Sequence, residues 1–282
     1  MGIHKTLLAN ILAAMGNNSP LQFGLNIYGM TGALPASGNA IVTINQVAAP
    51  GVITPAFNAS RNTGVAPLAV TFDAIGTVAS TFTSLPYSEV EYMVNFNDER
   101  GETWAYGPNP GGNNKNIAYG PVTVHVFETP GTYTVTLTAR FKNSSNVWTT
   151  QTATQTITVQ DPNVVFAGAA TICISQNSTP VAGQDGAPAG CAVQQVANWN
   201  TVQTLAQTYK RILLKRGDTW TTTSGVTLGA AHAGPGLIGA YGTGAKPVIS
   251  ATASMSHIAI ESGAGDWRVV DILMTGASVA ER

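Results

Sequence analysis

Hydrophobic and polar residues alternate strictly over residues 132–139, directly after a Pro-Gly turn. The apolar positions are Tyr133, Val135, Leu137 and Ala139, and threonine occupies each position between them. Successive side chains of a β-strand point to opposite faces, so one face of this strand is apolar and the other polar. The pattern predicts an antiparallel strand that lies between a core and water.

Four other short segments of residues 53–161 have the composition of strands, and turn residues separate them. They are Leu68–Phe72, Glu91–Phe96, Val122–Phe127 and Thr154–Val159. This number and spacing of short strands predict a β-sandwich of about a hundred residues.

Short apolar segments recur after residue 162 about every ten residues, with small turns between them. They are residues 210–220, 236–242, 247–250, 257–260 and 267–274. The pattern fits a parallel β-solenoid as well as a second sandwich. We expect a helix within residues 194–209 to cap the first coil, because an open solenoid end exposes unpaired strand edges. The sequence given ends at Arg282, shortly after the last expected strand and without a polar cap, so we expect further chain or another subunit to cover that end.

Residues 1–52 divide into a short apolar segment and a glycine-rich connector, in which residues 40–44 predict a strand. The apolar segment has a helical period, and its stripe is a candidate surface for docking in an assembly. The stripe consists of Leu7, Leu8, Ile11, Leu12 and Met15. A secretory signal would look similar, but Asn10 interrupts the apolar run and no convincing cleavage site follows. We favour a retained helix, with a signal peptide as the alternative.

Composition narrows the classes of partner. Charged residues make up 10% of the chain, with 13 Lys+Arg against 14 Asp+Glu, whereas ordinary globular proteins have about 25%. Such a chain has no field to attract nucleic acid or an anionic membrane. No apolar run approaches the roughly 20 residues of a transmembrane helix. We therefore expect no nucleic-acid partner and no membrane span.

The sequence contains few candidates for metal or redox chemistry. Cys173 and Cys191 are the only cysteines, and they form either a disulfide or two separate buried thiols. There is no CxxC motif, and four scattered histidines do not predict a zinc site. Asp98, Glu99 and Glu102 lack the full ligand series of a calcium site. We expect no metal and no cofactor.

No catalytic site is predicted either. Asp218, Asp266 and Asp271 stand beside turns, where aspartate caps the backbone, and we expect the neighbouring arginines to stay solvated. No GxSxG, HExxH or phosphate-loop motif is present. Aromatic residues near turns are candidate carbohydrate contacts, with packing in the core or rim as the alternative for each. They are Trp104, Tyr106, Trp148 and Trp220.

Residues 53–161 resemble a polycystic-kidney-disease (PKD) domain, an immunoglobulin-like sandwich found on cell surfaces, secreted enzymes and virus particles. The resemblance rests on Gly64–Ala74, His125–Ala139 and Thr156–Val159. The central family motif, Trp-Asp-Phe-Gly-Asp, stands at residues 94–98 as Val-Asn-Phe-Asn-Asp. The motif's phenylalanine and last aspartate are retained here, and its tryptophan and glycine are not.

Residues 162–282 resemble the entry coils of right-handed parallel β-helix proteins of the pectate-lyase-like kind, through residues 213–220, 236–242 and 267–272. The expected fold class is all-β. It consists of an immunoglobulin-like PKD sandwich followed by the start of a right-handed parallel β-helix, preceded by a short N-terminal helix and connector.

These resemblances imply a structural or adhesive protein of a virion, such as a bacteriophage tail fibre, tailspike or base of a decoration fibre. The sandwich would be a spacer and the β-helix the foot of a host-binding fibre. Expected partners are other virion proteins through residues 1–52, further copies of the chain, for instance in a trimer, and a host surface glycan. We expect no enzymatic activity in this chain, although a longer native β-helix could carry a depolymerase. The alternative is a secreted bacterial β-helix protein that binds or degrades polysaccharide; either hypothesis places the protein on a virion or otherwise outside the cell.

Overall fold

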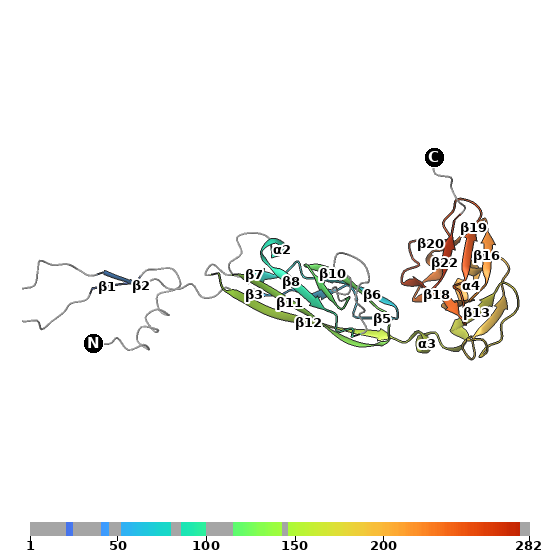
Figure 1. The fold of residues 1–282 in the computed structure, drawn as a ribbon, viewed down its shortest axis with the longest axis horizontal. Coiled ribbons are helices and arrows are strands. Elements are labelled where there is room, and N and C mark those ends of the chain that lie inside the picture. Colours follow the sequence, from blue (N-terminus) through green and yellow to red (C-terminus); the bar gives the residue numbers. More distant parts are fainter. Residues whose placement is uncertain are drawn as a thin grey trace, which may run out of the picture.

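The computed structural model describes residues 21–24, 41–44, 52–79, 86–99, 115–142 and 146–276. These residues form an all-β protein in which an antiparallel sandwich is followed by a region of parallel sheets (Figure 1). Near the N-terminus, β1 (Leu21–Gly24) pairs antiparallel with β2 (Ile41–Ile44), which confirms the strand predicted at residues 40–44. The predicted N-terminal helix lies outside the described residues.

The sandwich consists of two main sheets and a short ribbon. The first sheet has the order β10 (Val122–Phe127), β6 (Leu68–Asp73), β4 (Asn58–Ala59). The second has the order β5 (Thr63–Val65), β12 (Trp148–Gln160), β11 (Gly131–Lys142), β8 (Glu91–Asn95), β9 (Ile117–Tyr119). The ribbon pairs β3 (Ile53–Thr54) with β7 (Val78–Ala79), and α2 (Pro86–Glu89) precedes β8. All five predicted strands are present, and only the pair β12–β5 is parallel among the described strands of the sandwich.

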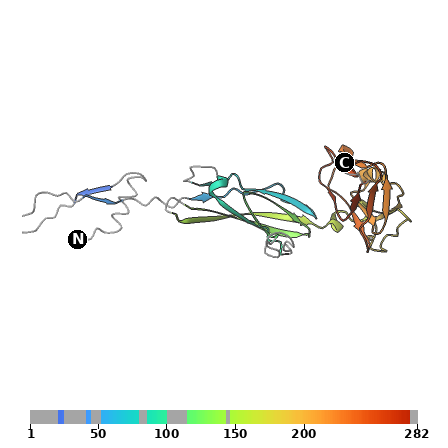
Figure 2. The same cartoon turned by 45° about the horizontal axis from the view of Figure 1, so that its top comes forward.

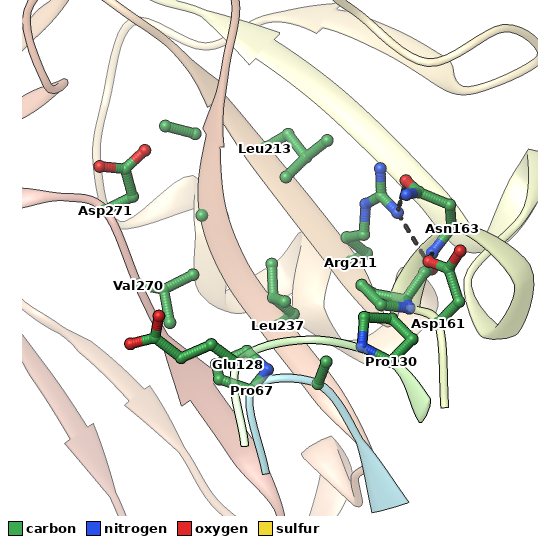
Figure 3. A pocket seen from close by; sticks show the side chains of 14 residues that line it. Pro67, Glu128, Pro130, Asp161, Asn163, Arg211, Leu213, Leu237, Val270 and Asp271 are labelled. Atoms are coloured by element: carbon green, nitrogen blue, oxygen red, sulfur yellow. Dashed lines mark hydrogen bonds between the residues drawn. The ribbon is translucent and has the colours of Figure 1, made fainter. Parts of the chain in front are cut away.

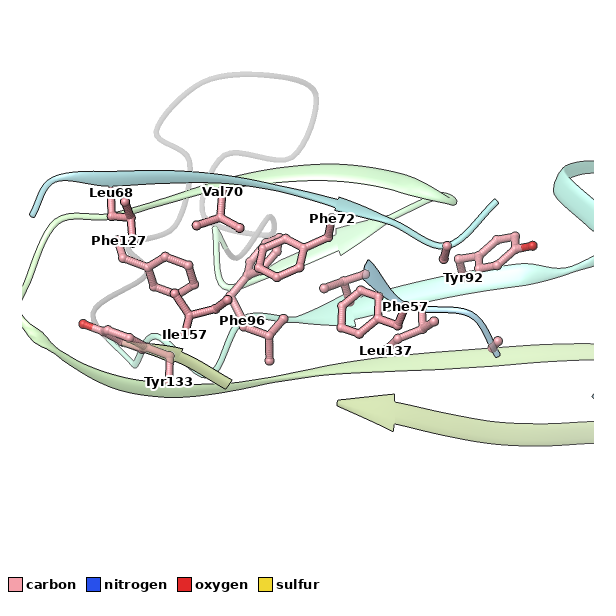
Figure 4. Packing of buried hydrophobic residues seen from close by; sticks show 14 of the residues in the cluster. Phe57, Leu68, Val70, Phe72, Tyr92, Phe96, Phe127, Tyr133, Leu137 and Ile157 are labelled. Atoms are coloured by element: carbon pink, nitrogen blue, oxygen red, sulfur yellow. The ribbon is translucent and has the colours of Figure 1, made fainter. Parts of the chain in front are cut away.

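The core of the sandwich follows from the alternation in its strands. Tyr133, Val135, Leu137 and Ala139 of β11 are buried, as predicted, while the threonines between them face outward. Aromatic rings from both sheets fill the space between them (Figure 4), and the centroids of Phe72 and Phe96 lie 5.7 Å apart. The hydroxyl of Tyr133 donates to the carbonyl of Thr129 at 2.8 Å, as in the tyrosine corner of immunoglobulin-like sandwiches.

Behind the sandwich, α3 (Pro162–Val165) and the 3-10 turn η1 (Gly168–Ala170) lead into three sheets in which every pair is parallel. The first has the order β14 (Ala192–Gln195), β13 (Thr171–Ser175), β15 (Arg211–Lys215), β18 (Gly236–Tyr241), β21 (Trp267–Val269). The second is β16 (Thr219–Thr222), β19 (Val248–Ala251), β22 (Leu273–Thr275), and the third is β17 (Val226–Leu228), β20 (Ile258–Ile260). From β15 onward, each strand pairs with the strand three places later in the chain.

Side chains that point inward from these sheets form a second core. Ile172, Ile212 and Ile238 stand side by side on β13, β15 and β18, and Trp220 and Ile249 face them from the second sheet. Helix α4 (Thr201–Thr208) packs against β15 and β17, with its residues Val202 and Ala206 buried in this core beside the preceding Trp199. A helix is therefore present within residues 194–209, as predicted. It is shorter than residues 194–209, because residues 192–195 add to the sheet as β14.

Candidate functional site

A cavity of about 400 Å³ lies where the sandwich meets the outer face of the first parallel sheet (Figure 3). Pro67 and Pro130 line it from turns of the sandwich, and Leu213 and Leu237 line it from β15 and β18. Three carboxylates also belong to its wall, those of Glu128, Asp161 and Asp271. None of the described residues that line it is Ser, Cys, His or Lys, so these residues include no nucleophile–base pair of the kind used in acyl transfer.

Among the described residues that line this cavity, Arg211 is the one basic residue, and it is only 6% exposed. Its Nη1 donates to the carbonyl of Pro162 and to Oδ1 of Asn163, both at 3.0 Å. Its Nε has no hydrogen-bond partner among the described residues. Burial lowers the pKa of this guanidinium from its ordinary value. The two bonds of Nη1 hold residues 162–170, the connector between the sandwich and the parallel sheets, against the first parallel sheet. Asp271 lies on the other side of the cavity (Figure 3).

A second arginine joins the sandwich to the parallel sheets. Arg268 donates from Nε to the carbonyl of Pro67 at 2.9 Å, and from Nη1 to the backbone carbonyl of Asp266 at 2.9 Å. Asp266 in turn forms ion pairs with Arg268 at 3.1 Å and with Arg61 of the sandwich at 2.6 Å. The expectation that the arginines near these turns stay solvated is wrong for Arg268, whose side chain is nearly buried because the end of the sandwich covers it.

The other aspartates have structural partners. Asp218 is buried and accepts from the hydroxyl of Ser175 at 2.6 Å, the backbone N–H of Gln176 at 2.8 Å and the amide of Asn177 at 2.8 Å. These bonds connect the end of β13 to the turn after β15. Asp271 is paired with Arg216. Both carboxylates therefore support turns, as the sequence predicted.

The predicted carbohydrate contacts have different positions. Trp104 and Tyr106 lie outside the described residues. The prediction for Trp220 is wrong: its ring is fully buried, and its Nε1 donates to the carbonyl of Val196 at 2.7 Å, because it fills the second core. Trp148 is 43% exposed on β12.

Two cations already contact the ring of Trp148. The guanidinium of Arg140 lies 4.6 Å and the ammonium of Lys142 5.2 Å from the ring centroid. A neighbouring hollow of about 330 Å³ is lined by Arg140 and by Tyr119, which is 76% exposed. Tyr119 is not among the contacts predicted from the sequence. It precedes a Gly-Pro turn, so the rule that selected the other aromatic residues would also have selected it.

Asp98 and His125 form a pair inside the sandwich, and Glu102, which was considered with Asp98, lies outside the described residues. Oδ2 of Asp98 lies 3.0 Å from Nε2 of His125, and the imidazole stacks on Phe96 with the centroids 4.2 Å apart. No cluster of three His, Cys, Asp or Glu side chains suited to a metal occurs in the described part of the chain. None of the helices in the described residues is long and apolar enough to cross a membrane.

Cys173 and Cys191 come together on the outer side of the first parallel sheet. Both are buried free thiols, and their Sγ atoms are 2.9 Å apart. Burial, and the neighbouring Cys191, raise the pKa of the Cys173 thiol above its ordinary value.

The antiparallel sheets, the tyrosine corner and the aromatic core define residues 52–160 as an immunoglobulin-like sandwich. More specifically, residues 56–157 match the PKD domain family. The match covers the sandwich and leaves the parallel sheets unassigned to a family. No curated protein matches the chain.

Proposed function

We propose that this chain is a structural, adhesive component of a fibre, with the PKD sandwich as a rigid spacer. In this proposal, residues 162–276 are the first coils of a right-handed parallel β-helix. The pairing of each strand from β15 onward with the strand three places later supports a coil of three strands per turn. The strong preference of parallel strand connections for right-handed crossovers supports its hand.

The proposal rests on the joint, the set of contacts between the sandwich and the parallel sheets. Domains that move relative to each other are usually connected by exposed linkers with few contacts. Here, buried Arg268 bonds to Pro67 of the sandwich, and Val65 of the sandwich packs among side chains of the sheet. Buried Arg211 bonds to Pro162, at the start of the connector between the two parts. Such a joint fixes the orientation of the sandwich relative to the parallel sheets as well as the distance between them. This property suits a spacer in a fibre.

We further propose that the fibre belongs to a bacteriophage particle, as a tail fibre, a tailspike or a decoration fibre. Residues 1–52 would contact other virion proteins, and further copies of the chain would complete the fibre. The resemblance of the two parts to PKD domains and to β-helix entry coils supports this placement. A surface made polar by uncharged residues rather than by charges also agrees with it.

Two measurements test the proposal. Small-angle X-ray scattering of the full chain should fit one rigid arrangement of the sandwich and the parallel sheets, and Arg268→Ala with Arg61→Ala should broaden the distribution of sizes. A broad distribution for the unaltered chain would overturn the rigid spacer. Antibody labelling of native phage particles, with N-terminal sequencing, tests the location. An intact start at Met1 or Gly2 is expected, and cleavage between residues 14 and 40 would contradict a virion protein.

The exposed Trp148 and Tyr119 favour a second candidate, a secreted protein that binds or degrades polysaccharide. Binding of the chain to a panel of bacterial polysaccharides, lost in Trp148→Ala and kept in Val147→Ala, would support this candidate. Depolymerisation of such a polysaccharide by residues 1–282 would show that the chain is an enzyme.

A further inference from the structure

The two thiols lie where the sandwich, the connector and the parallel sheet meet. Cys173 is on β13, and Cys191 directly precedes β14, the strand beside it. Around them is an apolar cluster with members from all three segments, including Val65 of the sandwich, Phe166 of the connector and Leu213 of the sheet. Cys173 is fully buried and Cys191 is 6% exposed. With 2.9 Å between the sulfur atoms, only a small approach separates them from bonding distance, about 2.05 Å.

The chain between the two cysteines covers part of the outer face of the sheet. Residues 176–190 contain no strand or helix. A Cβ at Gly186 would lie 2.9 Å from the Cα of Gly242, so the loop lies directly against the end of β18. At its start the loop is held by the bonds of Gln176 and Asn177 to Asp218. Near its middle, Asp185 forms an ion pair with Lys215 at 3.3 Å, in which the Asp185 side chain is largely exposed. Exposed ion pairs contribute little to stability, so a covalent bond at the base of the loop would hold it much more firmly.

We propose that Cys173 and Cys191 are a modification site, at which they form a disulfide that fastens residues 176–190 over the sheet at its joint with the sandwich. The two thiols lose two protons and two electrons as the S–S bond forms. With glutathione disulfide as oxidant, its own S–S bond breaks and two molecules of glutathione are released. This inference does not depend on the proposed fibre function.

The order of events follows from burial. A thiolate attacks the oxidant, and the raised pKa of buried Cys173 leaves little thiolate in the folded protein. We therefore expect the bond to form while the chain folds, and the folded, reduced protein to oxidise slowly. Once formed, the bond would be equally protected from reductants.

The test compares the full chain refolded with glutathione disulfide and the same chain refolded under reducing conditions. After denaturation and treatment with iodoacetamide, the reduced chain should carry two labels. The oxidised chain should carry none, and a proteolytic digest should contain a peptide that links Cys173 to Cys191. Two labels on a natively folded chain after oxidative refolding would overturn the proposal, as would disulfides between separate chains.

A second measurement tests the fastening of the loop. Cleavage beside Asp185 by an aspartate-specific protease should be at least tenfold slower in the oxidised chain than in the reduced chain. The double variant Cys173→Ala/Cys191→Ala should be cleaved at one rate under both conditions. Equal cleavage of the oxidised and reduced unaltered chains would show that the bond does not fasten the loop. The comparison of redox states uses the unaltered sequence, so it stands even where the variant folds poorly.

Discussion

The strands of the sandwich and those of the first parallel sheet bury their side chains differently. In β6, buried and exposed residues alternate without exception, whereas every residue of β13 and four of five in β15 are buried. Two strands of the second parallel sheet again alternate: in β16, Trp220 is buried between exposed threonines, and in β19 every second residue is buried. Parallel pairing alone therefore does not cause burial on both faces. The cause is that the sandwich, the connector and the loop 176–190 cover the outer face of the first sheet.

The molecule has two separate hydrophobic cores and a smaller cluster between them. The sandwich core and the core inside the parallel sheets share no residues, and a third, smaller cluster contains members of both parts. Because cooperative unfolding follows contiguous cores, we expect the sandwich and the parallel sheets to unfold in separate transitions. The following predictions test this difference, beginning with the largest effect.

Trp220→Ala should remove most of the stability of the parallel sheets. It empties the space of a fully buried indole and deletes the bond to the carbonyl of Val196, and such truncations cost about 3–5 kcal/mol. Differential scanning calorimetry should show the transition of the parallel sheets at lower temperature and the sandwich transition nearly unchanged.

The reciprocal variant is Phe72→Ala, which truncates a fully buried ring of the sandwich core. It should lower only the sandwich transition, by a similar free energy. If either variant lowers both transitions equally, the two cores are a single cooperative unit and the comparison fails.

Gly225→Ala should destabilise the parallel sheets by about 1–3 kcal/mol. A Cβ at this position would collide with the backbone carbonyl of Ser256, which belongs to the neighbouring pass of the chain. Gly229→Ala is the matched control, because its Cβ would meet no atom within 4 Å and its φ of −120° suits any residue. Urea unfolding of both variants measures the difference in their stability. Equal unfolding midpoints would show that the backbone of Ser256 is not packed closely against Gly225.

The reduced protein should lose stability as the pH rises above about 8.5, the ordinary pKa of a cysteine. Burial raises the pKa of Cys173 in the folded state, so above pH 8.5 the unfolded chain releases this proton and the folded chain keeps it. Stability from this group is complete below pH 8.5 and falls by up to about 1.4 kcal/mol per pH unit until the folded pKa is reached.

Urea unfolding of the reduced chain at pH 8.5 and 9.5 measures this loss. Tyr241 and Tyr92, whose pKa values burial also raises, add a similar loss only above their ordinary pKa of about 10. The Cys173→Ala/Cys191→Ala variant should be less sensitive between these two pH values. An equal slope in that variant would assign the loss to other groups.

Tyr133→Phe should have the smallest effect, about 1 kcal/mol, because it removes one hydrogen bond to the carbonyl of Thr129 and leaves the packing of the ring intact. The loss should appear only in the sandwich transition. No shift of that transition would mean that the corner contributes no stability.

The sandwich could be predicted closely because its strands are half-exposed. Alternation alone identifies β11, and the segment predicted at Val122–Phe127 has the same bounds as β10. The strands of the parallel sheets were harder to predict from the sequence. Strand β13 was missed because a short segment buried on both faces does not alternate. Strand β14, whose residues are half-buried or exposed, was missed because it overlaps the helix expected within residues 194–209. Residues 267–274 look like one strand but form β21 and β22, since Asp271 has a φ of +61° and turns the chain between them.

The site was predictable only in part, because its contacts join residues distant in sequence. Nothing near Arg268 in the sequence indicates that Pro67, 201 positions away, accepts its hydrogen bond. Likewise, proximity to turns did not distinguish buried Trp220 from exposed Trp148. The spacing of the two cysteines left open whether they meet, and only the path of residues 176–190 brings them together.

The sandwich lies against the outer face of the first parallel sheet, whereas the outward-facing side chains of β16, β17, β19 and β20 are exposed or half-buried among the described residues. The sandwich adjoins one flank of the parallel sheets in both views (Figures 1 and 2), and the contacts of Arg268 and Arg211 identify that flank as the outer face of the first sheet. A large partner that approaches the parallel sheets from the side therefore meets the second and third sheets, β16–β19–β22 and β17–β20. The position of the sandwich on the first sheet thus decides which faces of the parallel sheets a large partner can contact.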